Sequence, residues 1–171
     1  MKLKLGLAAL AAVALAGCER VEEGRVGAEE LLAAQSDEAN WITYGRNYEE
    51  QRFSPLKAIS TENVGDLGLE WFADMDTARG QEATPLVIDG KMYLTTAWSK
   101  VKAYNAVTGE ELWTYDPEVP GETAVKACCD VVNRGVAVYQ DKLFFGTIDG
   151  RLIALDQKSG DQVWETRTFP I

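Results

Sequence analysis

Short apolar runs separated by polar turns fill the second half of the chain. Residues 135–166 hold four such runs, which are Gly135–Tyr139, Leu143–Thr147, Arg151–Leu155 and a last one ending near Thr166. The turns between them are Gln140-Asp141, Asp149-Gly150 and Gln157–Gly160. Asp-Gly and Ser-Gly turns between alternating runs predict β-hairpins, because glycine accepts the positive φ that these turns need. The pattern therefore predicts four short antiparallel strands.

The same pattern occurs once before, at an offset of 51 residues. Residues 84–115 correspond to residues 135–166, with matches that include Val87 and Val138, Lys91 and Lys142, Ala103 and Ala154, Gly109 and Gly160, and Trp113 and Trp164. Asp89-Gly90 and Thr108-Gly109 supply the turns of the earlier unit. A repeat of this length indicates a solenoid or a propeller, and four antiparallel strands per repeat are typical of a propeller blade. We predict an all-β fold made of β-propeller blades.

Each repeat carries a tryptophan in its last strand. The segments from Ala103 through Gly109 to Trp113 and from Ala154 through Gly160 to Trp164 resemble the tryptophan-docking motif of quinoprotein propellers. In that family the ring packs between neighbouring blades. A buried aromatic on any strand would explain one occurrence, whereas two occurrences at a fixed spacing favour docking.

The length of the chain limits the number of blades. At roughly 40–50 residues per blade, residues 40–171 supply about two to three blades, whereas propellers close with 4–8. An open array of blades leaves strand edges exposed. We expect residues 40–171 to be the N-terminal portion of a longer propeller, truncated just after a blade.

The first residues have the pattern of an export signal. Lys2 and Lys4 precede an apolar stretch, residues 5–15, that is too short to span a bilayer as a stable helix. Leu15-Ala16-Gly17-Cys18 resembles the bacterial lipoprotein processing box, in which the cysteine becomes lipidated. We predict a signal peptide over residues 1–17 and a periplasmic protein anchored to the membrane through Cys18. Plain secretory cleavage that leaves Cys18 free is the alternative.

Composition narrows the chemistry. The formal net charge is −10 and the chain has no basic run, which argues against a nucleic-acid partner. There is no histidine, so this chain has no His-based catalysis, no His-ligated metal and no Cys-x-x-Cys-His haem attachment. Residues 18–39 are polar and are predicted to form a tether with a short helix near Glu29 to Ala34.

Cys128 and Cys129 are adjacent in the sequence. If Cys18 carries lipid, these two form an even pair in an oxidising compartment. Ordinary disulfides join Cα atoms about 4.4–6.8 Å apart, whereas neighbouring Cα atoms lie about 3.8 Å apart, so a bond between them is strained. Such a bond closes almost no loop and would serve as a surface instead of a staple. The dipeptide alone fits two unbonded thiols equally well.

The repeat also relates Glu82 to Arg134. Adding the offset to Glu82 gives Asn133, the neighbour of Arg134, so both lie before the innermost strand of successive blades. We expect them to converge with the cysteine pair at one end of the propeller axis. Arg134 can bind carboxylates of a planar anion, and Glu82 can accept hydrogen bonds from a ligand. A mutual or local ion pair that caps the strand ends is the alternative.

Cys128 to Gly135 resembles the vicinal-disulfide motif of alcohol dehydrogenases that depend on pyrroloquinoline quinone (PQQ). Trp41 to Asn47, Arg52 to Leu56 and Gln81 to Pro85 resemble further segments of that family, and the similarity covers about residues 40–169. The resemblance implies an eight-bladed propeller with PQQ on its axis. It also implies a Cys128–Cys129 disulfide that stacks on the quinone, with Glu82 and Arg134 as equatorial contacts.

The resemblance further implies calcium, an alcohol substrate, and a cytochrome or haem domain as electron acceptor. The calcium ligands and the catalytic aspartate of the family lie further along its chain, so no catalytic or metal-binding residue is assigned here and this chain alone is expected to be inactive. Two alternatives share the fold: a lipoprotein propeller scaffold of the outer-membrane assembly machinery, and a PQQ-dependent sugar dehydrogenase. Neither gives a reason for the cysteine pair.

Overall fold

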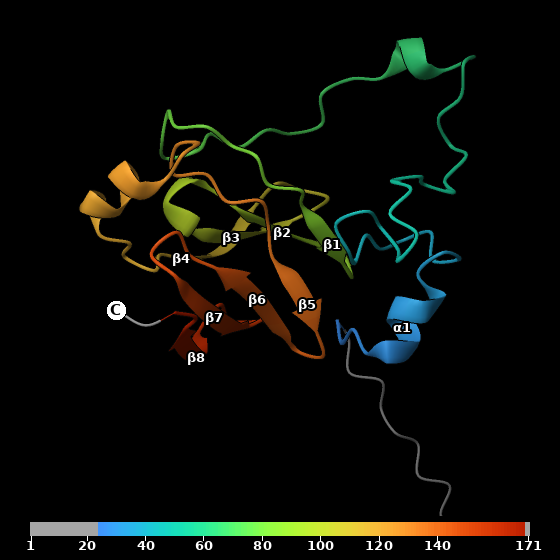
Figure 1. Cartoon of the computed structure of the whole chain (residues 1–171). Coiled ribbons are helices and arrows are strands. Elements are labelled where there is room, and N and C mark those ends of the chain that lie inside the picture. The colour runs from blue at the N-terminus through green and yellow to red at the C-terminus, as the bar shows by residue number, and fades with distance from the viewer. Residues whose placement is uncertain (1–23, 170–171) are drawn as a thin grey trace, which may run out of the picture.

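The computed structural model describes residues 24–169, which form two four-stranded antiparallel sheets (Figure 1). The first sheet consists of β1 (Leu86–Ile88), β2 (Lys91–Thr95), β3 (Val101–Asn105) and β4 (Glu111–Tyr115), paired in that order. The second consists of β5 (Ala137–Tyr139), β6 (Lys142–Gly146), β7 (Arg151–Asp156) and β8 (Gln162–Arg167), again paired in chain order. These are the predicted strands, within two residues at most ends. The predicted signal peptide and Cys18 lie outside the described residues.

Turn residues set the register of both sheets. Gly90, Gly109, Gly150 and Gly160 all have positive φ, as the hairpin prediction requires. In the first hairpin Ile88 pairs with Lys91, and in the corresponding hairpin Tyr139 pairs with Lys142. The two sheets therefore repeat at the level of individual residue pairs.

The N-terminal part of the described chain packs beside the inner strands. Helix α1 (Ala28–Ala33) confirms the helix predicted near Glu29 to Ala34. Val26 is buried and exchanges two backbone hydrogen bonds with Gln140, and the backbone of Trp41 pairs with that of Val87 in β1. From residue 24 onward the segment predicted as a tether is thus held against the sheets, because it has apolar side chains to bury.

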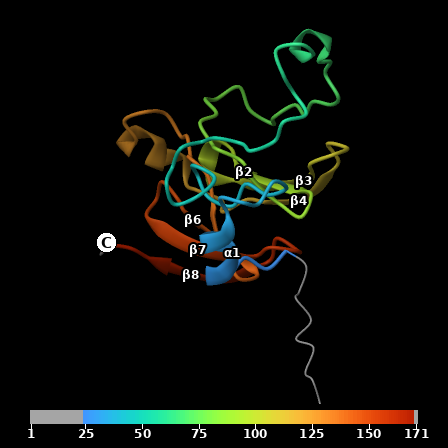
Figure 2. The ribbon, with the colours of Figure 1, turned by 90° about the vertical axis from the view of Figure 1, so that its right-hand side faces the viewer.

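The two sheets face each other as layers, with α1 beside them (Figure 2). An aromatic pair joins the layers, because the Tyr115 ring of β4 lies 6.1 Å from the Phe145 ring of β6. Within the first sheet, the Tyr93 ring lies 6.0 Å from that of Trp113. Tyr93 is fully buried and belongs to a single apolar cluster shared by both sheets. The inward-facing side chains of each sheet therefore bury those of the other.

Trp113 docks against a glycine of the neighbouring unit, as predicted, whereas Trp164 is 38% exposed and its ring lies 6.0 Å from that of Phe144 in the same sheet. A Cβ atom on Gly160 would lie 2.6 Å from the Trp113 ring, so this ring of the first sheet covers the β7–β8 turn of the second. Trp71 covers Gly109 in the same way, and its indole N–H donates to the Ala106 carbonyl at 3.1 Å. Trp71 thus takes the place that a docking tryptophan of a preceding blade would have, although residues 67–85 contain no strand.

In the described part of the chain, three short 3₁₀ helices lie outside the sheets: η1 (Val64–Asp66), η2 (Ala97–Ser99) and η3 (Gly121–Lys126). The chain around η1 runs away from both sheets (Figure 1), and its large apolar side chains are exposed, among them Phe53, Leu69 and Phe72. Within residues 24–169, no helix has the length and hydropathy needed to cross a membrane.

Antiparallel pairing divides the connections between two ends of the sheets. The segments that enter β1 and β5 share one end with the β2–β3 and β6–β7 connections, while the tight β1–β2, β3–β4, β5–β6 and β7–β8 turns lie at the other. Glu82 and Arg134 therefore belong to the same end of neighbouring sheets. This end carries the candidate site.

Candidate functional site

The loop that carries the cysteine pair, residues 127–135, is anchored to the first sheet on both sides of its turn. Val131 is fully buried, and its carbonyl accepts a hydrogen bond from the backbone N–H of Trp98 at 2.8 Å. Near the other end, the N–H of Thr84 donates to the carbonyl of Arg134 at 3.3 Å. These contacts set the height of the loop against β1 and against the β2–β3 connection.

Gly135 allows the two inner segments to approach closely. Its φ is +126°, and a Cβ atom there would lie 3.0 Å from the Thr84 carbonyl oxygen. Asn133 supports the same turn: its side-chain amide donates to Gly146 at 2.7 Å, while its oxygen accepts from the N–H of Gly135 at 3.1 Å. A larger residue at position 135 would push the loop away from the neighbouring sheet.

Glu82 and Arg134 meet, as their equivalent places in the repeat predict. The distance from Arg134 Nη2 to Glu82 Oε2 is 2.9 Å, and the two side chains remain 68% and 44% exposed. The interpretation as a mutual ion pair thus describes the geometry of this structure. Because both groups reach solvent, their unused hydrogen-bonding atoms are also available to a ligand.

Cys128 and Cys129 are free, exposed thiols in this structure. The pKa of the Cys129 thiol is raised, chiefly because it hydrogen-bonds to Cys128 and is repelled by the charge of that group. The positive charge of Arg134 lowers the pKa of this thiol and the negative charge of Glu82 raises it, so both side chains lie close enough to influence the thiol. The four predicted site residues therefore belong to two loops at one end of the sheets that the Glu82–Arg134 ion pair joins, whereas the disulfide remains a prediction.

Two charged residues at this site were missed by sequence reasoning. Arg79 Nη1 lies 2.7 Å from Asp130 Oδ1, and the Arg79 guanidinium carbon lies 6.0 Å from the centre of the Trp98 ring. Asp130 directly follows Cys129. The signal was present in the repeat, because Arg79 and Asp130 are 51 residues apart. Opposite charges at equivalent positions of two blades predict a contact between them.

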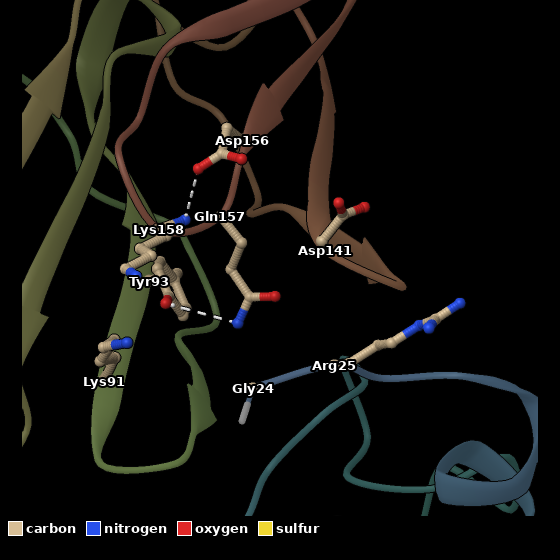
Figure 3. Close-up of a pocket in the computed structure, with 8 residues that line it drawn as sticks. All are labelled: Gly24, Arg25, Lys91, Tyr93, Asp141, Asp156, Gln157 and Lys158. Carbon is tan, nitrogen blue, oxygen red and sulfur yellow. Dashed lines mark hydrogen bonds between the residues drawn. The ribbon is translucent and has the colours of Figure 1, made fainter. Parts of the chain in front are cut away.

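A separate cavity of about 460 Å³ lies at the opposite end of the sheets (Figure 3). It is lined by residues from both sheets and the N-terminal segment, namely Gly24, Arg25, Lys91, Tyr93, Asp141, Asp156, Gln157 and Lys158. The amide nitrogen of Gln157 lies 3.4 Å from the hydroxyl of Tyr93 inside it. None of the predicted site residues contributes to this cavity. Among residues 24–169, no group of three or more His, Cys, Asp or Glu side chains is placed to hold a metal ion.

The repeated four-stranded sheets with docked tryptophans, and polar groups gathered at one end of their inner strands, define a β-propeller of the quinoprotein type. The family described as glucose/ethanol/alcohol dehydrogenase, beta-propeller domain (PQQ), matches residues 41–166. The dehydrogenase subunit of alcohol dehydrogenase (quinone) from Komagataeibacter europaeus is 57% identical over 148 residues, which are 86% of this chain and 20% of that protein.

Two further relatives come from Pseudomonas putida. Its quinohemoprotein alcohol dehydrogenase ADH IIB is 51% identical over 144 residues, which are 83% of this chain and 21% of that protein. The solved structure of its quinohemoprotein alcohol dehydrogenase ADHIIG is similar with a TM-score of 0.84 at 47% identity, over 87% of this chain and 22% of that one.

A europium-containing methanol dehydrogenase gives a TM-score of 0.76 at 35% identity, over 81% of this chain and 25% of that one.

The chain belongs to the PQQ β-propeller dehydrogenase family. It spans about a fifth of the length of the curated relatives that it matches. Membership of this family favours the dehydrogenase interpretation over the scaffold one.

Proposed function

We propose that this chain is part of a PQQ-dependent dehydrogenase that oxidises alcohols and passes two electrons to the quinone and onward to a cytochrome. The relatives at 50% identity or more support an alcohol substrate, because their names are alcohol or 1-butanol dehydrogenase. One of them is named with cytochrome c, which supports that class of acceptor. The family description also includes glucose, so the choice of an alcohol rests on these closer relatives.

The observation that carries the proposal is the convergence of Glu82, Arg134 and the cysteine pair. They come from equivalent loops of two neighbouring sheets, and the ion pair of 2.9 Å joins them at the end of the inner strands. Propeller ligands commonly bind on the axis, which the inner strands surround. These residues would form one part of a quinone site, and the rest of the longer protein would supply the other part.

The chemistry of these groups fits the quinone. PQQ is a planar tricarboxylate, and a guanidinium pairs with a carboxylate through two parallel hydrogen bonds. Glu82 would hold the Arg134 side chain in place and accept hydrogen bonds from the ligand. We propose that Cys128 and Cys129 form a disulfide in the exported protein, whose flat and polarizable face would lie against the ring system. When bound, PQQ supplies the two-electron acceptor that these side chains lack.

We also propose calcium as the metal of the longer protein, with ligands and the catalytic base outside this chain, and an export signal with a lipid anchor at Cys18. The sequence of residues 1–18 supports the anchor. A lipid at Cys18 would hold the protein at the periplasmic side of a membrane without a spanning helix.

Replacing the cysteine pair tests the proposed site. In the intact protein with calcium, we expect Cys128→Ser with Cys129→Ser to weaken PQQ binding about tenfold or more, which corresponds to about 1.4 kcal/mol. The same change should lower the free energy of unfolding by less than about 1 kcal/mol, because the bond closes almost no loop and the pair is exposed. Equilibrium dialysis with PQQ and urea unfolding measure the two effects.

Val125→Ser provides the matched control, since Val125 is 87% exposed on the preceding η3 helix and the change introduces the same hydroxyl. Its PQQ affinity should equal that of the parent protein. A large loss of stability with unchanged PQQ binding would show that the cysteine pair is a staple. Absence of PQQ binding and of alcohol-dependent dye reduction in the well-folded parent would defeat the proposed function.

A further inference from the structure

Two ion pairs, and not one, connect the segment before β1 with the cysteine loop. Glu82 and Arg134 belong to the proposed quinone site, whereas Arg79 pairs with Asp130, the residue that directly follows Cys129. Their distance of 2.7 Å is the shorter of the two. The segment before β1 therefore contacts the cysteine loop at two points, one directly after the cysteine pair and one four residues later.

Asp130 is held by more contacts than an ordinary surface carboxylate. One carboxylate oxygen accepts the hydrogen bond from Arg79, and the other accepts from the N–H of Gly80 at 3.4 Å. The pKa of Asp130 is lowered, first by a hydrogen bond from the N–H of Val131 and further by Gly80 and Arg79. Its φ of +65° is in the left-handed region, which aspartate and asparagine tolerate better than most residues.

The next residue is fixed from the same side. Val131 is fully buried, and its carbonyl accepts from the N–H of Trp98, whose ring lies near the Arg79 guanidinium. The backbone immediately after Cys129 is thus defined at two successive residues, 130 and 131. Since the cysteines themselves are exposed, their orientation depends on where this backbone leaves the turn.

We propose that Arg79 and Asp130 form a clasp that positions the Cys128-Cys129 dipeptide for the quinone. This inference rests on the proposed function of the site. Arg79 and Asp130 are positioning residues, which act on the ligand through the cysteine pair. An ion pair whose side chains are 52% and 33% exposed contributes little to global stability, so its effect should be local.

Neutral variants of the clasp separate position from folding. Asp130→Asn removes the charge while it keeps the shape and the tolerance of a left-handed backbone. Arg79→Gln removes the partner, and the double variant completes a thermodynamic cycle. Asp141→Asn is the matched control, because it neutralises one partner of another exposed ion pair, with Lys142, at the opposite end of the same sheet.

We expect each clasp variant of the intact protein to bind PQQ about fivefold to tenfold more weakly, or about 1–1.4 kcal/mol. The double variant should bind no more weakly than either single variant, because both changes break the same contact. The PQQ affinity of the control should match that of the parent within about twofold. For all variants, the ratio of folded to unfolded protein under one set of conditions should also lie within about twofold of the parent value. Parent-like PQQ binding by both single variants, or additive losses in the double variant, would overturn the clasp.

A second readout does not need PQQ. After reduction, oxidised glutathione closes the two thiols into a disulfide with release of two molecules of reduced glutathione, and the rate follows from the mass of the peptide that contains the pair. If the parent protein binds no PQQ, the proposed function fails and this rate decides the clasp. We then expect closure at least about threefold slower in both single variants than in the control. Equal rates would overturn the inference.

Discussion

The docking of Trp113 on Gly160 gives the most quantitative prediction about this fold. Gly160 has a φ of +77°, and an alanine Cβ there would lie 2.6 Å from two atoms of the Trp113 ring. Real Cβ atoms do not approach other atoms so closely, so the ring or the turn has to move. Movement of the ring disturbs Tyr93, which packs against it in the shared core.

The cost of Gly160→Ala has two parts. The left-handed backbone costs roughly 1–2 kcal/mol for a residue with a Cβ. Displacement of the ring adds about 1–3 kcal/mol, which is the usual range for overpacking a well-packed core. We expect the free energy of unfolding to fall by about 2–5 kcal/mol, with a small offset of roughly 0.4–1 kcal/mol from the stiffer unfolded chain.

Gly90→Ala is the matched control for this experiment. Gly90 has nearly the same φ, +72°, and a Cβ there would meet no atom within 4 Å. Urea unfolding of both variants isolates the contact term as the difference between their free energies. If Gly160→Ala is no more destabilising than Gly90→Ala, the tryptophan does not dock tightly on this glycine and the reasoning is refuted.

Two titrations test the electrostatics of the sheets. Burial acts to raise the pKa of Asp149, but hydrogen bonds from Thr147 and Arg151 outweigh this effect and lower the pKa. The ionised Asp149 carboxylate therefore stabilises the fold above about pH 4, and this contribution is lost as pH falls through the folded-state pKa. Asp149→Asn should therefore lower the free energy of unfolding in urea at pH 7 by about 1–3 kcal/mol. On acidification the variant should lose less stability than the parent, and an equal loss would contradict this assignment. Burial and the neighbouring Glu111 carboxylate raise the pKa of Tyr104 to about 12, so Glu111→Gln should move the last tyrosinate absorbance step to lower pH, and an unmoved step would refute the coupling.

At the site, the sequence could predict those contacts that join residues about one repeat length apart. The offset takes Glu82 to Asn133, the neighbour of Arg134, so counting residues predicted that Glu82 and Arg134 converge, with their ion pair as the alternative to ligand contacts. The partnership of Arg79 with Asp130 was available from the same offset. It was missed because a single opposite-charge coincidence is weak evidence until the loops that carry it are known to face each other.

Sequence alone determined the strands, the turns and the repeat, because hydrophobic alternation and glycine φ preferences are local properties that are encoded within each repeat. It also carried the family resemblance, since the cysteine-pair motif is contiguous. The tertiary structure decided that Trp71 docks like Trp113 although no strand surrounds it, and that residues 24–39 pack on the sheets. Those outcomes depend on contacts between segments far apart in the chain, where burial of apolar surface outweighs local preference, and no local pattern encodes such contacts.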